Sequence, residues 1–261
     1  MARAELETLY RQLRAHGADE VLEALFALRR LVPDLEPQER SEAAAAVASL
    51  FYLDVQDRPE MATVVDQAIR LLHSMGPDLI PLHMEEMRGS DFKALFCFAR
   101  VLALFGSEAV TPIIDACRGS DDSHLLVGGI YALTKIRDRS ILQGLDLVLE
   151  LTGHGDSEVR DTAVRALGKF VERFGKQFDT SAAERSYTRL MAASVDPLPA
   201  IRAKAVRGLG KMAAAGILSS DQRARVQSRL DQVLGQSSEM GWDQAFIVRR
   251  EAAEAAEHLA D

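Results

Sequence analysis

Residues 76–91 read GPDLIPLHMEEMRGSD, and residues 106–121 read GSEAVTPIIDACRGSD. Both segments begin with Gly, carry a Pro, and end in Arg-Gly-Ser-Asp after the same interval, at an offset of 30 residues from Gly76 to Gly106. A Gly that ends one helix and a Ser-Asp pair that begins the next are the signals of a tight helix–turn–helix. The echo therefore predicts helix pairs that repeat along the chain.

A second signature recurs in the C-terminal half of the sequence. Its copies are DSEVRDTAVRALG at 156–168, DPLPAIRAKAVRGLG at 196–210, the weaker FIVRREAAEAA at 246–256 and the eroded DSHLLVGGIYAL at 122–133. When the copies are aligned on Ala163, Ala205 and Ala252, they are spaced by 42 and then 47 residues. The period therefore lengthens toward the C-terminus while the pattern is kept.

The signature describes an amphipathic helix that can pack closely on its neighbours. Val159, Ala163 and Leu167 lie at i, i+4 and i+8, which is one face of a helix. Ala163 and Ala166 are small, so neighbouring helices can approach one another.

One arginine occupies an equivalent place just after the helix start in each full copy, as Arg160, Arg202 and Arg249. From this place an arginine can reach the Asp or the exposed carbonyls of the next repeat. We therefore expect a ladder of arginine contacts along the stack, with a structural role.

The Asp-x-x-Val-Arg-x-x-Ala-x-x-Ala-Leu-Gly pattern at 156–168 resembles the second helix of HEAT repeats, particularly the short bacterial kind also seen in phycobilisome-lyase-type proteins. The resemblance is most specific over 156–214, extends over 76–155 and is weakest before residue 76. It implies an all-α fold, an α-α superhelix (a right-handed solenoid) of about seven HEAT-like helix pairs. A shared fold does not by itself define a function.

We expect a single HEAT-like repeat domain over residues 1–261. Within it, 76–214 would hold the clearest repeats, 1–75 the divergent N-terminal cap repeats and 215–261 the C-terminal cap repeat, because end repeats must present a polar outer face. The predicted helix pairs are 3–15 with 18–31, 41–53 with 59–75, 77–88 with 91–105, 107–118 with 121–137, 139–153 with 156–174, 180–194 with 197–214, and 219–235 with 242–260.

Composition narrows the function classes. The net charge of −8 argues against generic binding to a polyanion such as DNA. The charged amphipathic start MARAELETLYRQLR is not a signal peptide, and no window approaches the roughly 18 apolar residues of a membrane span. We expect a cytoplasmic protein in which Cys97 and Cys117 are buried thiols without a disulfide.

Motifs for chemistry are missing from the sequence. The six histidines form no His-Glu-x-x-His motif, and His83 with Glu85 and Glu86 has no second ligand pair at the repeat spacing. The di-iron HEAT-like deoxyhypusine hydroxylases use His-Glu dipeptides, which do not occur here. Trp242-Asp243 invites comparison with HEAT-like alkylpurine DNA glycosylases, but a hydrophobic staple beside an Asp cap explains both residues. The sequence predicts no catalytic residue, no cofactor and no metal site.

Basic residues concentrate in one part of the chain. Residues 156–235 carry fourteen Lys or Arg against nine Asp or Glu. Within this segment, one helix places three basic residues at i, i+4 and i+8, and the next repeat supplies two equivalents. In HEAT stacks the second helices line the concave surface, so the resemblance implies a basic stripe there. Its members are Arg165, Lys169, Arg173, Arg207 and Lys211.

The stripe has two interpretations. Its residues are either solvated positions paired with neighbours such as Asp161 or Glu172, or a docking site for an acidic or phosphorylated segment. We expect a non-catalytic scaffold or adaptor that holds a protein partner on its concave face. The alternatives are a lyase-like accessory acting on a chromophore or a modified protein and, disfavoured by the charge, a nucleic-acid-binding protein. The oligomeric state is not predicted.

Overall fold

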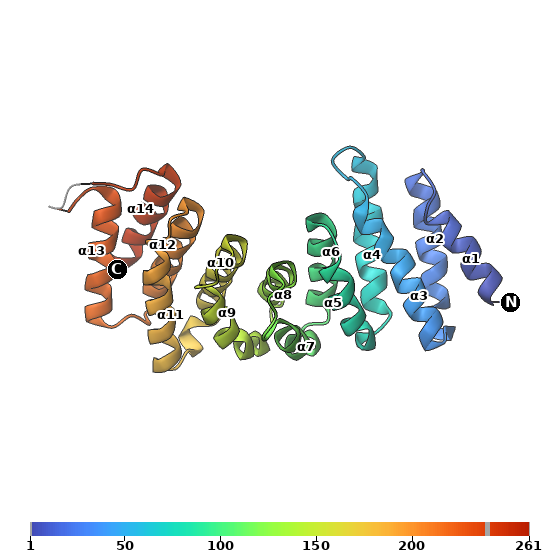
Figure 1. Ribbon diagram of the computed structural model, residues 1–261, viewed down its shortest axis with the longest axis horizontal. Coiled ribbons are helices and arrows are strands. Elements are labelled where there is room, and N and C mark those ends of the chain that lie inside the picture. The colour runs from blue at the N-terminus through green and yellow to red at the C-terminus, as the bar shows by residue number, and fades with distance from the viewer. Residues whose placement is uncertain (1, 238–240, 261) are drawn as a thin grey trace. The chain divides into compact units, whose positions relative to one another are not determined.

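The computed structural model describes residues 2–237 and 241–260, and these residues form α-helices and short 3-10 segments with no strand (Figure 1). The α-helices are α1 (Ala2–Gln12), α2 (Ala18–Leu31), α3 (Pro37–Ala48), α4 (Ala62–Ser74), α5 (Ile80–Arg88), α6 (Phe92–Leu104), α7 (Ser107–Cys117), α8 (Ser123–Lys135), α9 (Leu145–Leu151), α10 (Ser157–Phe174), α11 (Thr180–Ala193), α12 (Pro199–Ala214), α13 (Ser220–Leu234) and α14 (Phe246–Ala260). Each odd-numbered helix and the helix after it correspond to one predicted pair, so the predicted all-α repeat solenoid of about seven helix pairs is confirmed in the described residues.

Several helices begin where an aspartate caps the first turn. Asp156 accepts hydrogen bonds from the backbone N–H groups of Glu158 at 2.8 Å and Val159 at 3.4 Å, which begins α10. Asp91 accepts one from Ala94 at 2.8 Å and begins α6 in the same way. These carboxylates satisfy N–H groups that lack a partner within the helix.

Several predicted helices differ from the structure at their N-terminal ends, and three of them show why. The helix predicted to begin at 41 begins at Pro37, because proline suits the first helical position and the Glu39 carboxylate accepts from the Glu36 N–H at 3.2 Å. Residues 139–144 form a 3-10 segment, and only 145–151 are α-helical. The last helix begins at Phe246 rather than 242.

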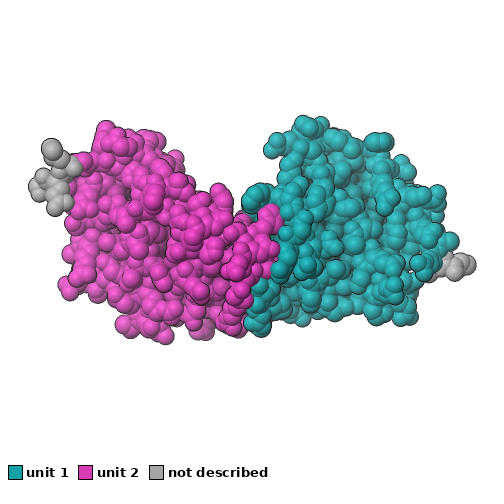
Figure 2. Space-filling view, viewed as in Figure 1, with its two compact units in different colours: residues 1–116 teal, residues 117–261 magenta. Residues whose placement is uncertain are grey.

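The chain divides into two compact units, residues 1–116 and 117–261 (Figure 2). In the first unit the second helices of each pair, α2, α4 and α6, pack in succession, and α1, α3 and α5 pack against them. The buried rings of Phe51 and Phe98 meet edge to face with centroids 5.0 Å apart. The single-domain organisation of 1–261 stays a prediction.

In the second unit, α8, α10, α12 and α14 pack in succession, and α9, α11 and α13 each contact the second helix of their own pair. Glycines allow these second helices to approach closely. A Cβ at Gly210 in α12 would lie 2.8 Å from the Cβ of Ala255 in α14, and one at Gly168 in α10 would lie 3.7 Å from the Cα of Gly208 in α12. The row of second helices is therefore a tightly packed layer.

No helix in residues 2–237 or 241–260 is both long enough and apolar enough to span a membrane. Cys117 is buried and Cys97 is partly buried, both as thiols. Burial raises the pKa of the Cys97 thiol to about 11, so this thiol is protonated at neutral pH.

Candidate functional site

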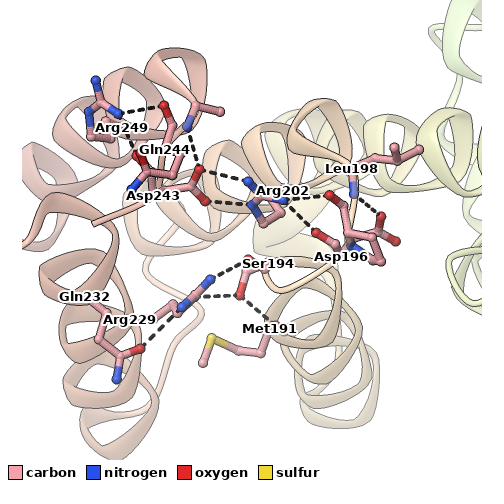
Figure 3. A network of polar contacts seen from close by, with 12 residues as sticks. Met191, Ser194, Asp196, Leu198, Arg202, Arg229, Gln232, Asp243, Gln244 and Arg249 are labelled. Carbon is pink, nitrogen blue, oxygen red and sulfur yellow. Dashed lines mark hydrogen bonds and ion pairs between the residues drawn. The ribbon is translucent and has the colours of Figure 1, made fainter. Parts of the chain in front are cut away.

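The predicted arginine ladder ties successive turns of the second unit together (Figure 3). Arg202 Nη1 donates to the backbone oxygens of Asp196 at 2.9 Å and Pro197 at 3.0 Å, in its own turn. Its Nε and Nη2 donate to the two carboxylate oxygens of Asp243 in the next repeat, at 2.6 and 2.8 Å. Hydrogen bonding by Arg202 lowers the pKa of the Asp243 carboxyl below its usual range. One guanidinium thus joins two consecutive repeats.

The rung before it has the same construction. Arg160 Nη1 donates to the backbone oxygens of His154 and Gly155, both at 2.9 Å, and its Nε donates to an Asp196 carboxylate oxygen at 2.9 Å. The prediction that the arginines reach the Asp of the next repeat is confirmed for Arg160 and Arg202. The carbonyls that they bind belong to their own turns.

The last rung replaces the acidic partner with aromatic rings. Arg249 Nη1 donates to the backbone oxygens of Asp243 at 2.6 Å and Gln244 at 3.1 Å, and its guanidinium lies 4.3 Å from the centroid of the Trp242 ring. Trp242 is 56% exposed, and Asp243 lies three residues before α14. The expected staple is wrong, because the Trp242 ring is exposed and lies against Arg249. The Asp243 carboxylate does accept a backbone hydrogen bond just before α14, from the Ala245 N–H at 3.0 Å, and it binds Arg202 as well.

The ladder keeps α10 and α12 in the same register. In each rung the arginine follows the first carbonyl that it binds by six residues. Arg165 and Arg207 therefore occupy equivalent positions on the two helices, and so do Lys169 and Lys211. Because α10 and α12 pack against one another, all four side chains come to one surface.

These four residues line a single shallow pocket of about 410 Å³ between α10 and α12. Gly168 and Gly208 line it as well, at the point where the two backbones approach. The pocket also contains Lys204, which sequence reasoning missed. Its position three residues before Arg207 on the same helix face is the signal that could have found it.

Arg173, the fifth member of the predicted stripe, lies elsewhere. Its Nη1 donates to the backbone oxygens of Thr134 at 2.8 Å and Ile136 at 3.0 Å, at the C-terminal end of α8. It therefore ties α10 to the preceding repeat instead of lining the pocket.

Three carboxylates neutralise part of the pocket's charge. Glu172 accepts from Lys169 at 2.9 Å and from Lys211 at 2.7 Å, and these hydrogen bonds lower the pKa of the Glu172 carboxyl to about 2. The other two ion pairs join Lys204 to Asp161 and Arg207 to Glu251.

Glu251 and Arg165 have contrasting surroundings. The Glu251 side chain is 1% exposed and also pairs with Arg250 at 3.0 Å. Arg165 is exposed and forms no ion pair or hydrogen bond with the described part of the chain. Arg165 is therefore the cation of the pocket that is most available to a ligand.

The histidine considered as a metal ligand is a core residue. His83 is 1% exposed and lies against Phe98 and Phe105, with ring centroids 6.4 and 6.3 Å away. Burial lowers the pKa of His83 to about 4, so its ring is neutral near pH 7. The Glu85 side chain is 74% exposed. Over residues 2–237 and 241–260, no group of three or more His, Cys, Asp or Glu side chains is arranged to hold a metal ion.

Comparisons with known proteins agree with this architecture. A HEAT repeat family model matches residues 145–174, which comprise α9 and α10. Crystal structures of three engineered proteins have a similar fold, and no curated protein sequence matches the chain. The first is 19% identical, with 97% of this chain and 98% of that chain covered and a TM-score of 0.53. Another is 18% identical, with 98% and 96% covered and a TM-score of 0.53, and the third is 18% identical, with 98% and 68% covered and a TM-score of 0.52. At these identities the likeness shows the fold alone.

Proposed function

We propose that this HEAT-repeat α-solenoid is a non-catalytic binding module that holds an anionic segment of a protein partner against α10 and α12. Repeat solenoids present extended binding surfaces built from equivalent positions of successive repeats. The second helices are the ones that line the concave side in HEAT stacks. The observation that carries the proposal is the convergence of five cationic side chains from two equivalent helices on one pocket: Arg165, Lys169, Lys204, Arg207 and Lys211.

The local charge supports an anionic ligand even though the chain carries a net charge of −8. Five cations line the pocket, and the carboxylates that pair with them are three. The Lys169 and Arg207 side chains remain 38% and 46% exposed while paired, so their remaining N–H donors face solvent. A cationic patch on an otherwise acidic protein attracts an acidic segment locally and favours one docking position over others.

The test is a charge reversal at the two members of the pocket on α10. The double variant Arg165→Glu with Lys169→Glu should bind a fluorescent oligoglutamate peptide with an affinity at least about tenfold lower, because two attractive charges become repulsive. Fluorescence anisotropy measures the binding, and an oligoglutamine peptide of equal length reports retention that does not depend on charge.

A matched control reverses two exposed arginines on other helices. Arg189→Glu with Arg225→Glu changes the net charge equally and should leave oligoglutamate binding unchanged. Equal binding by the wild type and the pocket variant would show that the surface of α10 and α12 is not the site. Arg207 is left intact because its reversal would place a second carboxylate beside the buried Glu251 and destabilise the fold.

A further inference from the structure

Glu172 binds two of the ammonium groups that line the pocket. One of its carboxylate oxygens, Oε2, accepts hydrogen bonds from Lys169 Nζ at 2.9 Å and from Lys211 Nζ at 2.7 Å. The two ammonium groups belong to neighbouring repeats, at equivalent positions of α10 and α12. A single oxygen atom thus bridges the two helices at the edge of the pocket.

This carboxylate lies where a ligand can reach it. The Glu172 side chain is 45% exposed, and its contact with Lys169 is an i, i+3 pair on the helix surface. Exposed pairs of this kind add little to stability. The Lys211 side chain is only 22% exposed, and burial lowers its pKa because it disfavours the charged ammonium form. A neighbouring anion therefore stabilises the charged Lys211 more than it stabilises an exposed lysine.

A phosphoryl group can displace the Glu172 carboxylate from the two lysines more readily than a carboxylate of a partner can. Glu172 is tethered beside the lysines, so a monoanionic carboxylate of a partner would replace it with a weaker, untethered copy. A phosphorylated side chain carries close to two negative charges and three acceptor oxygens. It can bridge both lysines and still accept from Arg165, whose exposed guanidinium matches the geometry of a phosphate.

We infer that the pocket binds a phosphorylated serine or threonine of a protein partner, and that Glu172 fills the phosphoryl position until the partner arrives. This inference rests on the proposed function and narrows its ligand from an anionic to a phosphorylated segment. Glu172 then acts as an internal competitor: it keeps Lys169 and Lys211 close together in the free protein and disfavours weakly charged ligands.

The experiment compares three fluorescent peptides with the same Gly-Ser sequence, in which the central residue is serine, phosphoserine or glutamate. The wild type should bind the phosphoserine peptide more tightly than the other two. Glu172→Gln should tighten that binding by at least about threefold, because the loss of one exposed ion pair removes the competitor. Lys211→Met should weaken it by at least about tenfold, because a charge-assisted bond to phosphate is lost. Inorganic phosphate should compete with the peptide.

The control variant is Glu158→Gln, which removes one negative charge from the exposed first turn of α10 and should leave the affinity unchanged. Thermal unfolding of each variant by circular dichroism shows whether it is folded at the temperature of the assay. If Lys211→Met is unfolded there, Lys169→Met takes its place.

The outcomes separate this inference from the proposed function. Equal affinity of the wild type and Glu172→Gln for the phosphoserine peptide would show that Glu172 is no placeholder. Equal affinity for the glutamate and phosphoserine peptides would overturn the phosphoryl assignment and leave the proposed function standing. Binding to phosphatidic acid vesicles without binding to the phosphopeptide would overturn the protein partner. If no anionic peptide binds and the pocket reversal changes nothing, the proposed function fails as well.

Discussion

The two units join neighbouring repeats with ion pairs of different kinds. In residues 1–116 the pair of Arg100 and Asp66, 2.7 Å apart, is exposed, with side chains 46% and 54% exposed. In residues 117–261 the pair of Arg202 and Asp243 is bidentate, and its side chains are 16% and 7% exposed. One repeat earlier, Arg160 binds Asp196 through one hydrogen bond, and these side chains are 19% and 10% exposed. The second unit therefore repeats one partly buried contact.

This difference agrees with the place of the arginine signature, whose copies all lie in the second unit. An exposed pair contributes little to stability and can move to another position without a large loss. A desolvated arginine that binds two carbonyls and a carboxylate leaves several groups unsatisfied when it is replaced. The recurring sequence pattern is therefore clearest where the contacts are buried.

The largest effect is expected from removal of a ladder carboxylate. Asp243→Ala should lower the free energy of unfolding by about 3 kcal/mol, because Arg202 loses both carboxylate oxygens in a partly buried position. Asp66→Ala in the first unit should cost less than about 1 kcal/mol. Urea denaturation followed by circular dichroism measures both values. Similar losses for the two variants would contradict the distinction between buried and exposed pairs.

The first unit has its own buried titratable group, and here the effect depends on pH. The pKa of His83 is about 4 in the folded protein and about 6.5 when it is exposed to water, so the unfolded chain binds a proton first as the pH falls. The contribution of His83 to stability is therefore complete above pH 6.5 and is lost progressively between about pH 6.5 and pH 4, by roughly 2 kcal/mol at pH 5. His83→Phe should remove this part of the pH dependence in urea titrations at pH 7 and pH 5. An unchanged difference between the two pH values would show that His83 is not its source.

A smaller loss is expected at the close approach of α12 and α14. Gly210→Ala would place a Cβ 2.8 Å from the Cβ and 2.9 Å from the Cα of Ala255, so the helices must separate. Overpacking of this kind costs typically 1–3 kcal/mol, while the helical preference of alanine returns up to about 1 kcal/mol. We expect a net loss of about 1 kcal/mol in urea denaturation. Gly89→Ala in the first unit, where a Cβ would meet nothing within 4 Å, should show no such loss.

The smallest effect is expected at the pocket itself. Arg165→Glu should change the free energy of unfolding by no more than about 0.5 kcal/mol, because the side chain is exposed and has no ion pair to lose. A large loss of stability in urea denaturation would mean that Arg165 has a structural role and would weaken the binding proposal.

Most of the fold follows from local signals in the sequence. Aspartate caps and glycine stops mark the helix ends, and the arginine pattern aligns the repeats. Pro37 was misplaced because proline both ends one helix and suits the first turn of the next. Trp242 was misplaced because it lies four residues before α14 and its ring contacts the Arg249 guanidinium instead of the helix.

The candidate site was predictable only in part. The spacing of 42 residues aligns Arg165 with Arg207 and Lys169 with Lys211, and the structure brings all four to one pocket. Glu172 was among the expected partners of these residues, and it pairs with Lys169 and Lys211. The pairing of Arg207 with Glu251 was not predictable, because it spans 44 residues and depends on how each helix is rotated. The diversion of Arg173 to α8 is likewise a consequence of the tertiary structure.

The constant interval of six residues in the ladder has a consequence for how such chains can change length. Five residues more separate Ala205 from Ala252 than separate Ala163 from Ala205, yet Arg249 still binds the carbonyl six residues before it. The added length therefore falls outside the six-residue interval between the Asp243 carbonyl and Arg249. Evolution can lengthen the connection before Asp243 without shifting the helix that follows it.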